Sequence, residues 1–314
     1  MSWTLYRWTW QLRAPLYLGM PPAGSLNRTR LFVPARTLWG ALAAELARHE
    51  AEGGAADYKG VGDALCRDAR FGYLFPAEYS AGRWRAWLPS YRGGLGLVWA
   101  REDDPNSRIS DRSFRRRVLH TRPGTSIDPR SDAAEEGSLR ETECIQPRWR
   151  DEESGAESPL AMTGYVFLRN DALRHRLETI RQVFVGGDSR YGLGLMERKD
   201  ALVPEERFFG DRVELDRKED EDPIVHSSVI RAHAIANGSN RDLLGERERI
   251  AGWGFEKRDQ QSGKASAWVP GSQDCGTDDP KYEIPRWRLC PVGVLAREDT
   301  DACDDRNDSS AAQR

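Results

Sequence analysis

The glycine-rich stretch at residues 185–195 constrains the fold of this chain more than any other segment. Its glycines are Gly186, Gly187, Gly192 and Gly194. Glycine adopts positive φ without steric cost and lets a second backbone come close, so the stretch predicts a sharp turn or a close backbone contact. Arg190 and Tyr191 lie between the glycines and offer a permanent charge and a flat ring. Two interpretations follow: a loop that binds an anionic polymer, or a tight connection between a helix and a strand.

Two common nucleotide-binding motifs do not fit this stretch. The phosphate-binding loop of NTPases needs a lysine directly after its second glycine, and Leu193 stands at that position. The dinucleotide-binding fingerprint begins with G-x-G between a strand and its helix, whereas here G-x-G comes last and a helix-like segment comes first. The spacing therefore excludes both motifs.

Positive and negative charges are nearly balanced, with 47 Lys and Arg against 50 Asp and Glu. A net charge of −3 leaves no positive field over the whole protein, so any nucleic-acid site must be local. The strongest positive segment lies between residues 108 and 130, with seven arginines against two aspartates. Residues 298–314 are acidic and have few apolar side chains, so we expect a disordered tail.

The five cysteines and five histidines do not have the spacing of a metal site. We therefore predict no bound metal and no other cofactor. Because the cysteines are widely separated and form no C-x-x-C motif, we expect reduced thiols and a cytoplasmic protein. No apolar run is long enough to span a membrane, so no membrane partner is expected.

The order of predicted elements indicates an α+β fold. Alternating aromatic and polar residues predict a first strand, leucines at four-residue intervals predict a helix capped by Thr37, and Asn170 or Asp171 caps a second helix. The predicted strands cover 3–12, 71–75, 85–88, 95–99, 162–168 and 193–198. This is a ferredoxin-like (RRM-like) β-α-β-β-α-β core. The aromatic octapeptide of RNA-recognition motifs is absent, so base stacking on the sheet is not predicted.

Composition shifts divide the chain into three parts. Residues 1–212 would form the ferredoxin-like domain, with a polar insertion at about 101–160 that is either functional or disordered. Residues 223–297 would form a C-terminal extension packed on this core, with strands at 229–236 and 287–296. Residues 298–314 are the expected disordered tail.

Arg28, Arg30 and Arg36 are the first candidate site for an anion. They flank the start of the first predicted helix, and the N-terminus of a helix itself favours anions. The alternative is a solvated loop with no ligand.

Arg115, Arg116 and Arg117 are the second candidate site. They could follow the phosphates of a nucleic acid while Phe114 or His120 stacks on a base. The alternative is a contact with a neighbouring subunit or a disordered basic loop.

Three segments together resemble the RAMP superfamily of CRISPR-associated proteins. The first joins Ala14–Gly19 to Phe32–Leu42, the second runs over Ile127–Glu143, and the third is the glycine-rich stretch. The resemblance implies a ferredoxin-like core, assembly with other Cas subunits into a type III effector ribonucleoprotein, and contact with CRISPR guide RNA for antiviral defence. It also implies target RNA as a further partner.

The chain departs from the family at positions that matter for catalysis. Family members that cut target RNA carry an aspartate in the loop after the first strand, but residues 15–34 contain no Asp, Glu or His. Ala35 and Arg36 replace the usual Gly-Ser pair before the helix. We therefore predict a non-catalytic RNA-binding subunit. An endoribonuclease of the same superfamily, acting on guide precursor or target RNA, and a ferredoxin-like scaffold without RNA remain the alternatives.

Overall fold

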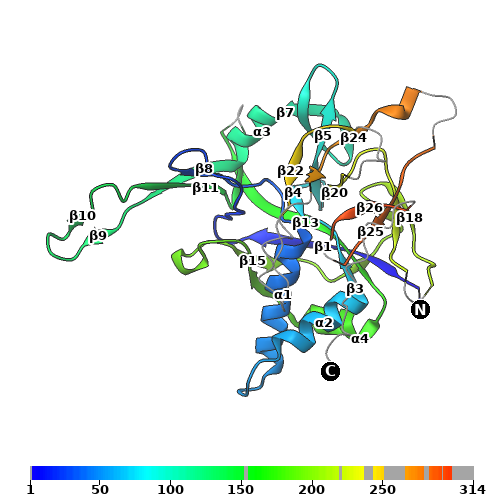
Figure 1. Cartoon of the computed structure of the whole chain (residues 1–314), viewed down its shortest axis with the longest axis horizontal. Coiled ribbons are helices and arrows are strands. Elements are labelled where there is room, and N and C mark those ends of the chain that lie inside the picture. The colour runs from blue at the N-terminus through cyan, green and yellow to red at the C-terminus, as the bar shows by residue number, and fades with distance from the viewer. Residues whose placement is uncertain are drawn as a thin grey trace, which may run out of the picture.

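A computed structural model of the chain describes residues 2–151, 155–218, 221–236, 243–250, 266–278, 283–291 and 293–298 (Figure 1). The acidic tail expected from residue 298 lies outside the described residues except for Glu298. Within the described part, an extensive antiparallel sheet, a second sheet and four α-helices make an α+β protein, as the sequence predicts.

The central sheet is built around β1 (Thr4–Leu12), which is rich in aromatic residues and buried from Leu5 onward. β1 pairs antiparallel with β13 (Glu157–Leu168) on one side and with β15 (Leu195–Arg198) on the other. β13 in turn pairs with β4 (Phe75–Ser80) and β3 (Ala69–Phe71). The sheet order is β14-β15-β1-β13-β4-β5-β6-β7. Its remaining strands are β14 (Gln182–Phe184), β5 (Arg83–Arg92), β6 (Gly96–Arg101), β7 (Asp104–Ser110), β12 (Arg148–Arg150) and β16 (Val203–Pro204).

Three helices pack together against this sheet (Figure 1). They are α1 (Ala35–Glu50), α2 (Tyr58–Asp68) and α4 (Asp171–Thr179). The predicted cap of the first helix at Thr37 is wrong, because the helix begins two residues earlier with Pro34 at the N-cap. Asn170 caps α4 by accepting a hydrogen bond from the backbone of Ala172. The sequence did not predict α2, in which two glycines interrupt the apolar pattern.

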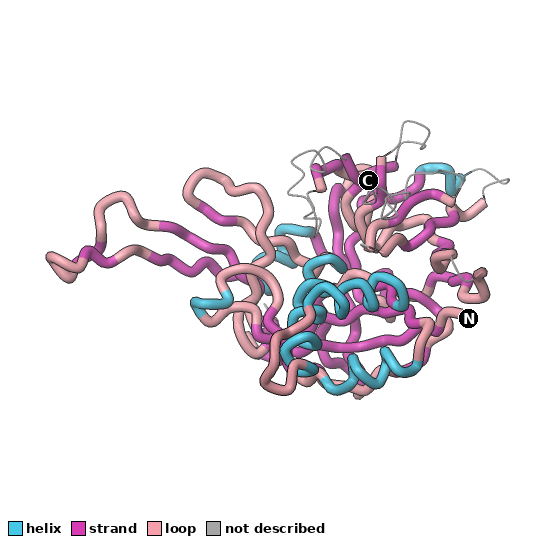
Figure 2. Tube along the Cα trace, turned by 60° about the horizontal axis from the view of Figure 1, so that its bottom comes forward, coloured by secondary structure: helices cyan, strands magenta, loops and turns pink. Residues whose placement is uncertain are grey.

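The polar stretch at 101–160 contains regular structure in its described residues. It includes β7, the short helix α3 (Asp111–Val118) and a long two-stranded projection over residues 119–145, called the arm below. Figure 1 and Figure 2 both show the arm extending away from the rest of the protein. The arm contains β8 (Leu119–Gly124), β9 (Ile127–Asp128), β10 (Ala133–Ala134) and β11 (Arg140–Ile145), and β2 (Leu26–Asn27) pairs with its base.

A second sheet contains much of the C-terminal part of the chain, in the order β17-β18-β19-β25-β26-β20-β23-β22. The predicted single strand at 287–296 is wrong, because a turn at Gly293 divides it into β25 (Arg286–Leu289) and β26 (Leu295–Arg297). Of the strand predicted at 229–236, only β20 (Ala234–Ile235) forms. The other strands are β17 (Arg207–Phe208), β18 (Asp211–Glu214), β19 (Ile224–His226), β22 (Arg247–Arg249) and β23 (Ser266–Trp268), and β21 (Leu243–Leu244) pairs with β24 (Gln273–Asp274).

One hydrophobic cluster joins the two sheets and the helices. It runs from Trp3, which precedes β1, and from Trp8 and Trp10 of β1 through the buried face of α1 to Trp287 and Leu295 of the second sheet. Cys66, Cys144 and Cys275 are free thiols, whereas Cys290 is disulfide-bonded, so the expectation that the thiols are reduced fails at Cys290. No helix among the described residues is long and apolar enough to cross a membrane.

Candidate nucleic-acid interface

The glycine-rich stretch folds onto the segment that follows β1. The backbone N–H of Gly187 donates to the carbonyl of Tyr17 at 3.0 Å, and that of Gly194 donates to Pro15 at 2.8 Å. The N–H of Val185 donates to the carbonyl of Gly194 at 3.0 Å, so the loop is also closed on itself. Although β14 comes between α4 and this loop, the predicted sharp turn and close backbone contact are both present.

Sterics require glycine at two of these positions. At Gly186, with φ +87°, a Cβ would lie 2.2 Å from the carbonyl oxygen of Tyr17, and at Gly194, with φ +85°, 2.1 Å from that of Val185. Gly192 also has positive φ, +80°, but a Cβ there would meet nothing within 4 Å. The prediction that Gly192 and Gly194 adopt conformations unfavourable for other residues is confirmed. Only Gly194 of these two is closely packed.

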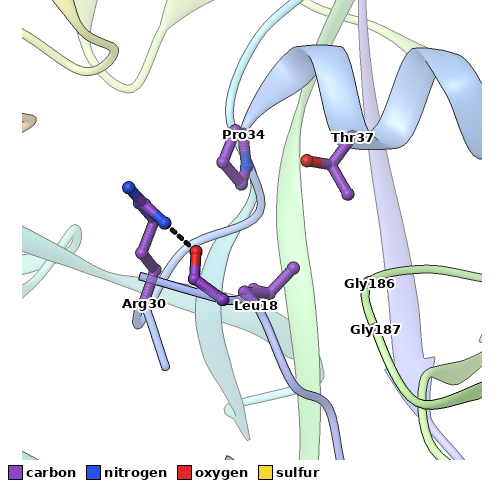
Figure 3. A pocket seen from close by; sticks show the side chains of 7 residues that line it. Leu18, Arg30, Pro34, Thr37, Gly186 and Gly187 are labelled. Carbon is purple, nitrogen blue, oxygen red and sulfur yellow. Dashed lines mark hydrogen bonds between the residues drawn. The ribbon is translucent and has the colours of Figure 1, made fainter. Parts of the chain in front are cut away.

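A pocket of about 260 Å³ lies between this loop, the segment after β1 and the start of α1 (Figure 3). It is lined by Leu18, Gly19, Arg30, Pro34, Thr37, Gly186 and Gly187. Arg30, Gly186 and Gly187 were predicted from sequence as RNA-binding residues, and the fold brings them together. Thr37, which the sequence suggested only as a helix cap, lies within the first turn and lines the pocket.

The start of α1 differs from that of the other described helices. Side chains of Asp57, Ser110 and Asn170 cap α2, α3 and α4, but Pro34 makes no side-chain cap; like α2, α1 also has no acidic residue in its first turn. The first-turn amides of α1 therefore have no intrahelical acceptor. They lie at the end of the helix that lines the pocket. Together with the helix dipole, they make this end of the pocket favourable for an anion.

The three arginines of the first candidate site are placed differently. Arg30 lines the pocket and donates to the carbonyl of Gly19 and to Glu248, the latter at 3.0 Å. Arg28 and Arg36 are half-buried and do not line the pocket. Burial lowers the pKa of Arg36, and the nearby thiol of Cys66 on α2 raises it by a smaller amount. Arg30 is therefore the one of the three that this pocket contains.

Arg190 and Tyr191 lie on the outer side of the loop. Tyr191 is 63% exposed, and the guanidinium of Arg140, from β11 of the arm, lies 4.6 Å from its ring centroid. Arg190 is exposed and has no ion-pair partner within the described part of the chain. Sequence reasoning did not single out Arg140, because its position opposite Tyr191 depends on how the base of the arm attaches to the segment after β1 through Leu16 and Ile145.

The second candidate site is largely engaged in contacts within the protein. Arg115 forms an ion pair with Asp111 at 2.7 Å, and the guanidinium of Arg117 lies 5.6 Å from the ring centroid of Trp149. Phe114 is fully buried and stacks on Trp99 at 4.3 Å, so the idea that it stacks on a base is wrong.

Arg116 and His120 complete the second candidate site and are both exposed. His120 lies on β8, opposite Cys144 of β11, at the base of the arm. Among the described residues no cluster of His, Cys, Asp and Glu could hold a metal ion.

No family model and no curated protein matches this chain. Solved structures do resemble it. A chain of a cryo-EM structure of the type III-B Cmr-beta complex bound to cognate target RNA and AMPPnP is 14% identical, with 85% of this chain and 84% of that chain covered and a TM-score of 0.49.

A chain of a second Cmr-beta structure, bound to cognate target RNA, matches at 14% identity and a TM-score of 0.47, with 85% of each chain covered. Oligomeric Cmr4 from Pyrococcus furiosus matches at 10% identity and a TM-score of 0.31, with 65% of this chain and 99% of that chain covered. In these comparisons the chain is similar to chains of type III-B Cmr structures.

Proposed function

We propose that this protein is a non-catalytic, RNA-binding subunit of a type III CRISPR–Cas effector ribonucleoprotein, and that it holds guide RNA at the pocket beside the glycine-rich loop. The observation that carries the proposal is a convergence. Arg30 and the Gly186–Gly187 pair lie far apart in sequence, yet they line one pocket together with the uncapped start of α1. Groups that can donate hydrogen bonds gather there, and none of the lining residues is a carboxylate, although Glu248 pairs with Arg30 from outside the lining.

The chemistry of the pocket suits a phosphate of the RNA backbone. First-turn amides of α1, the hydroxyl of Thr37 and the guanidinium of Arg30 can all donate hydrogen bonds to a phosphate, and the positive end of the helix dipole adds to them. None of these groups distinguishes one base from another. The subunit would therefore recognise the backbone and its shape, while base pairing between guide and target supplies sequence specificity.

The topology supports a ferredoxin-like core for this subunit. Strands β15-β1-β13-β4 are adjacent in that order, α1 lies between β1 and β4 in sequence, and α4 lies between β13 and β15. This order is the one expected of a β-α-β-β-α-β unit and supports the proposed core. The core would extend over residues 1–212 and the C-terminal extension over 223–297. The partners would be other Cas subunits, guide RNA and target RNA, in the cytoplasm.

A binding experiment tests RNA recognition at the pocket. We expect the full-length chain to bind a fluorescein-labelled single-stranded RNA, and Arg30→Ala to weaken that affinity about tenfold, the size expected when one charge-assisted contact is lost. Arg101→Ala is the matched control, because Arg101 is paired with Glu78 on the sheet and not in the pocket. Absence of RNA binding would favour the scaffold alternative.

A cleavage experiment tests the endoribonuclease alternative. The pocket is lined by no Asp, Glu or His that could act as a general base or bind a metal ion. We therefore expect the pure chain to leave guide precursor and complementary target RNA intact, with or without Mg²⁺. Site-specific cleavage that disappears in His120→Ala or Asp128→Ala would overturn the non-catalytic assignment.

A further inference from the structure

A chain of hydrogen bonds runs from the pocket into the core and joins segments that are far apart in sequence. The guanidinium of Arg30 donates to Glu248 Oε2 at 3.0 Å, and Glu248 Oε1 is hydrogen-bonded to Nε2 of His233. The other ring nitrogen of His233, Nδ1, is hydrogen-bonded to the hydroxyl of Tyr73 at 2.7 Å. Glu248 belongs to β22, so the C-terminal part of the chain reaches the residue that lines the pocket.

The inner end of this hydrogen-bonded chain is held rigidly. His233 and Tyr73 are each 3% exposed, and the ring of Phe32 lies 5.8 Å from that of His233 and 5.6 Å from that of Tyr73. Burial by itself raises the pKa of Glu248, but hydrogen bonds from His233 and the charge of Arg30 outweigh burial and lower the pKa below its usual value. Glu248 is therefore a carboxylate in a fixed position, with both oxygens engaged.

This arrangement fixes the direction of the Arg30 side chain. One terminal nitrogen of the guanidinium donates to the carbonyl of Gly19, and the other donates to Glu248 (Figure 3 shows the first of these bonds). A guanidinium has five N–H donors in one plane, so two anchored nitrogens set the plane and leave donors for a ligand. Without Glu248, the long side chain would regain rotamer freedom and lose part of that preorganisation.

We propose that Glu248 is a positioning residue of the phosphate pocket: held by His233 and Tyr73, it orients Arg30 toward an RNA phosphate. This inference rests on the proposed function, because it gives Glu248 a role only if Arg30 contacts RNA. It differs from two simpler roles. A counter-ion that merely neutralises Arg30 would weaken RNA binding by its presence, and a purely structural residue would affect folding alone.

A double-mutant cycle separates these roles. We expect Glu248→Ala to weaken binding of labelled single-stranded RNA to the full-length chain about as much as Arg30→Ala does, which is about tenfold. The double variant should be no weaker than Arg30→Ala alone, because both changes remove one and the same contact. Glu248→Gln retains an oxygen that accepts from Arg30, so we expect it to recover part of the loss.

The control for a nonspecific effect is Glu78→Ala. Its 2.7 Å ion pair with Arg101 has side-chain exposures of 17% and 27%, close to the 20% and 18% of Glu248 and Arg30, but lies outside the pocket. We expect Glu78→Ala to leave RNA affinity unchanged. If Glu248→Ala does not fold, the same cycle is measured with Glu248→Gln, whose loss should again disappear in the Arg30→Ala background.

Each contrary result has a distinct meaning. Tighter RNA binding in Glu248→Ala would identify a counter-ion, and an unchanged or strictly additive effect would identify a structural residue; each of these overturns the positioning role and leaves the pocket intact. If Arg30→Ala itself leaves RNA affinity unchanged, the phosphate pocket is wrong and the positioning role fails with it.

Discussion

Two arginine-rich regions differ in how their charges are used. Around α3, Arg115 is paired with Asp111 and Arg117 covers Trp149, so much of the positive charge stabilises the base of the arm. At the pocket, Arg30 meets the uncapped start of α1 and the glycine-rich loop. Density of positive charge in the sequence is greater in the first region, but the second brings Arg30, which is paired with Glu248, together with first-turn amides of α1 that have no intrahelical acceptor. A binding site is better indicated by that convergence than by local charge.

The largest expected effect concerns the structural role of α3. Phe114 is fully buried, stacks on Trp99 and lies 5.5 Å from the ring centroid of Trp149. We expect Phe114→Ala to lower the free energy of unfolding by about 3–5 kcal/mol, because it leaves a cavity among aromatic rings. Chemical denaturation measures this loss. Phe184→Ala is the control, since the Phe184 ring is 51% exposed. A stable Phe114→Ala protein with impaired RNA binding would restore Phe114 as a base platform.

The next prediction compares the stability cost of substitutions at two glycines of the glycine-rich loop. A β-carbon at Gly194 would approach the carbonyl of Val185 to 2.1 Å, while one at Gly192 would meet no atom within 4 Å. We expect Gly194→Ala to cost about 3 kcal/mol of unfolding free energy. Gly192→Ala should cost only about 1 kcal/mol, the backbone penalty of positive φ alone. Equal melting temperatures for the two variants would contradict the close packing assigned to the loop.

Local patterns predicted part of the central sheet and its flanking helices, but the strand predicted at 71–75 falls on the break between β3 and β4, and β7, β12, β14 and β16 were not predicted. β1, β13 and α4 follow directly from alternation, leucine spacing and the Asn170 cap. The same rules failed where tertiary contacts decide the outcome. α2 contains two glycines, and β8, β9 and β10 bury no side chain, so backbone pairing and the buried end of β11 hold the arm together. Composition alone does not reveal such pairing.

The candidate site was predicted only in part for a similar reason. A cluster of glycines in the sequence indicates an unusual backbone conformation, so Gly186 and Gly187 were identified from sequence. Glu248 and Arg140 carry no local signal, because each becomes relevant only when the fold places it beside a residue more than 40 positions away. A method that uses local sequence patterns finds the loop but not Glu248 and Arg140, which contact Arg30 and Tyr191 only in the folded chain.

A direct comparison of the two arginine regions should show a difference in RNA affinity. We expect Arg30→Ala to lower affinity about tenfold and to reduce the slope of log affinity against log salt by about one, because one phosphate contact is lost. The double variant Arg115→Ala, Arg117→Ala should change affinity by less than about twofold, since neither side chain lines the pocket and each is engaged with a neighbour on or beside α3. Fluorescence anisotropy across a salt series measures both quantities. The opposite ranking would make α3 the main RNA surface.

The smallest expected change in RNA affinity tests whether the outer side of the glycine-rich loop contacts RNA. Arg190 and Arg112 are both exposed arginines without an ion-pair partner in the described part of the chain, one on the glycine-rich loop and one on α3. If the loop follows the RNA backbone, Arg190→Ala should lower affinity about threefold and the salt slope by about one, as expected for one exposed phosphate contact. Arg112→Ala should change neither, and both variants should melt like the wild type because neither side chain is packed. Equal losses in the two variants would mean that RNA contacts both regions. A silent Arg190→Ala would restrict RNA contact to the pocket side of the loop, where Arg30 lies, and would leave Tyr191 and Arg140 as a structural contact between loop and arm.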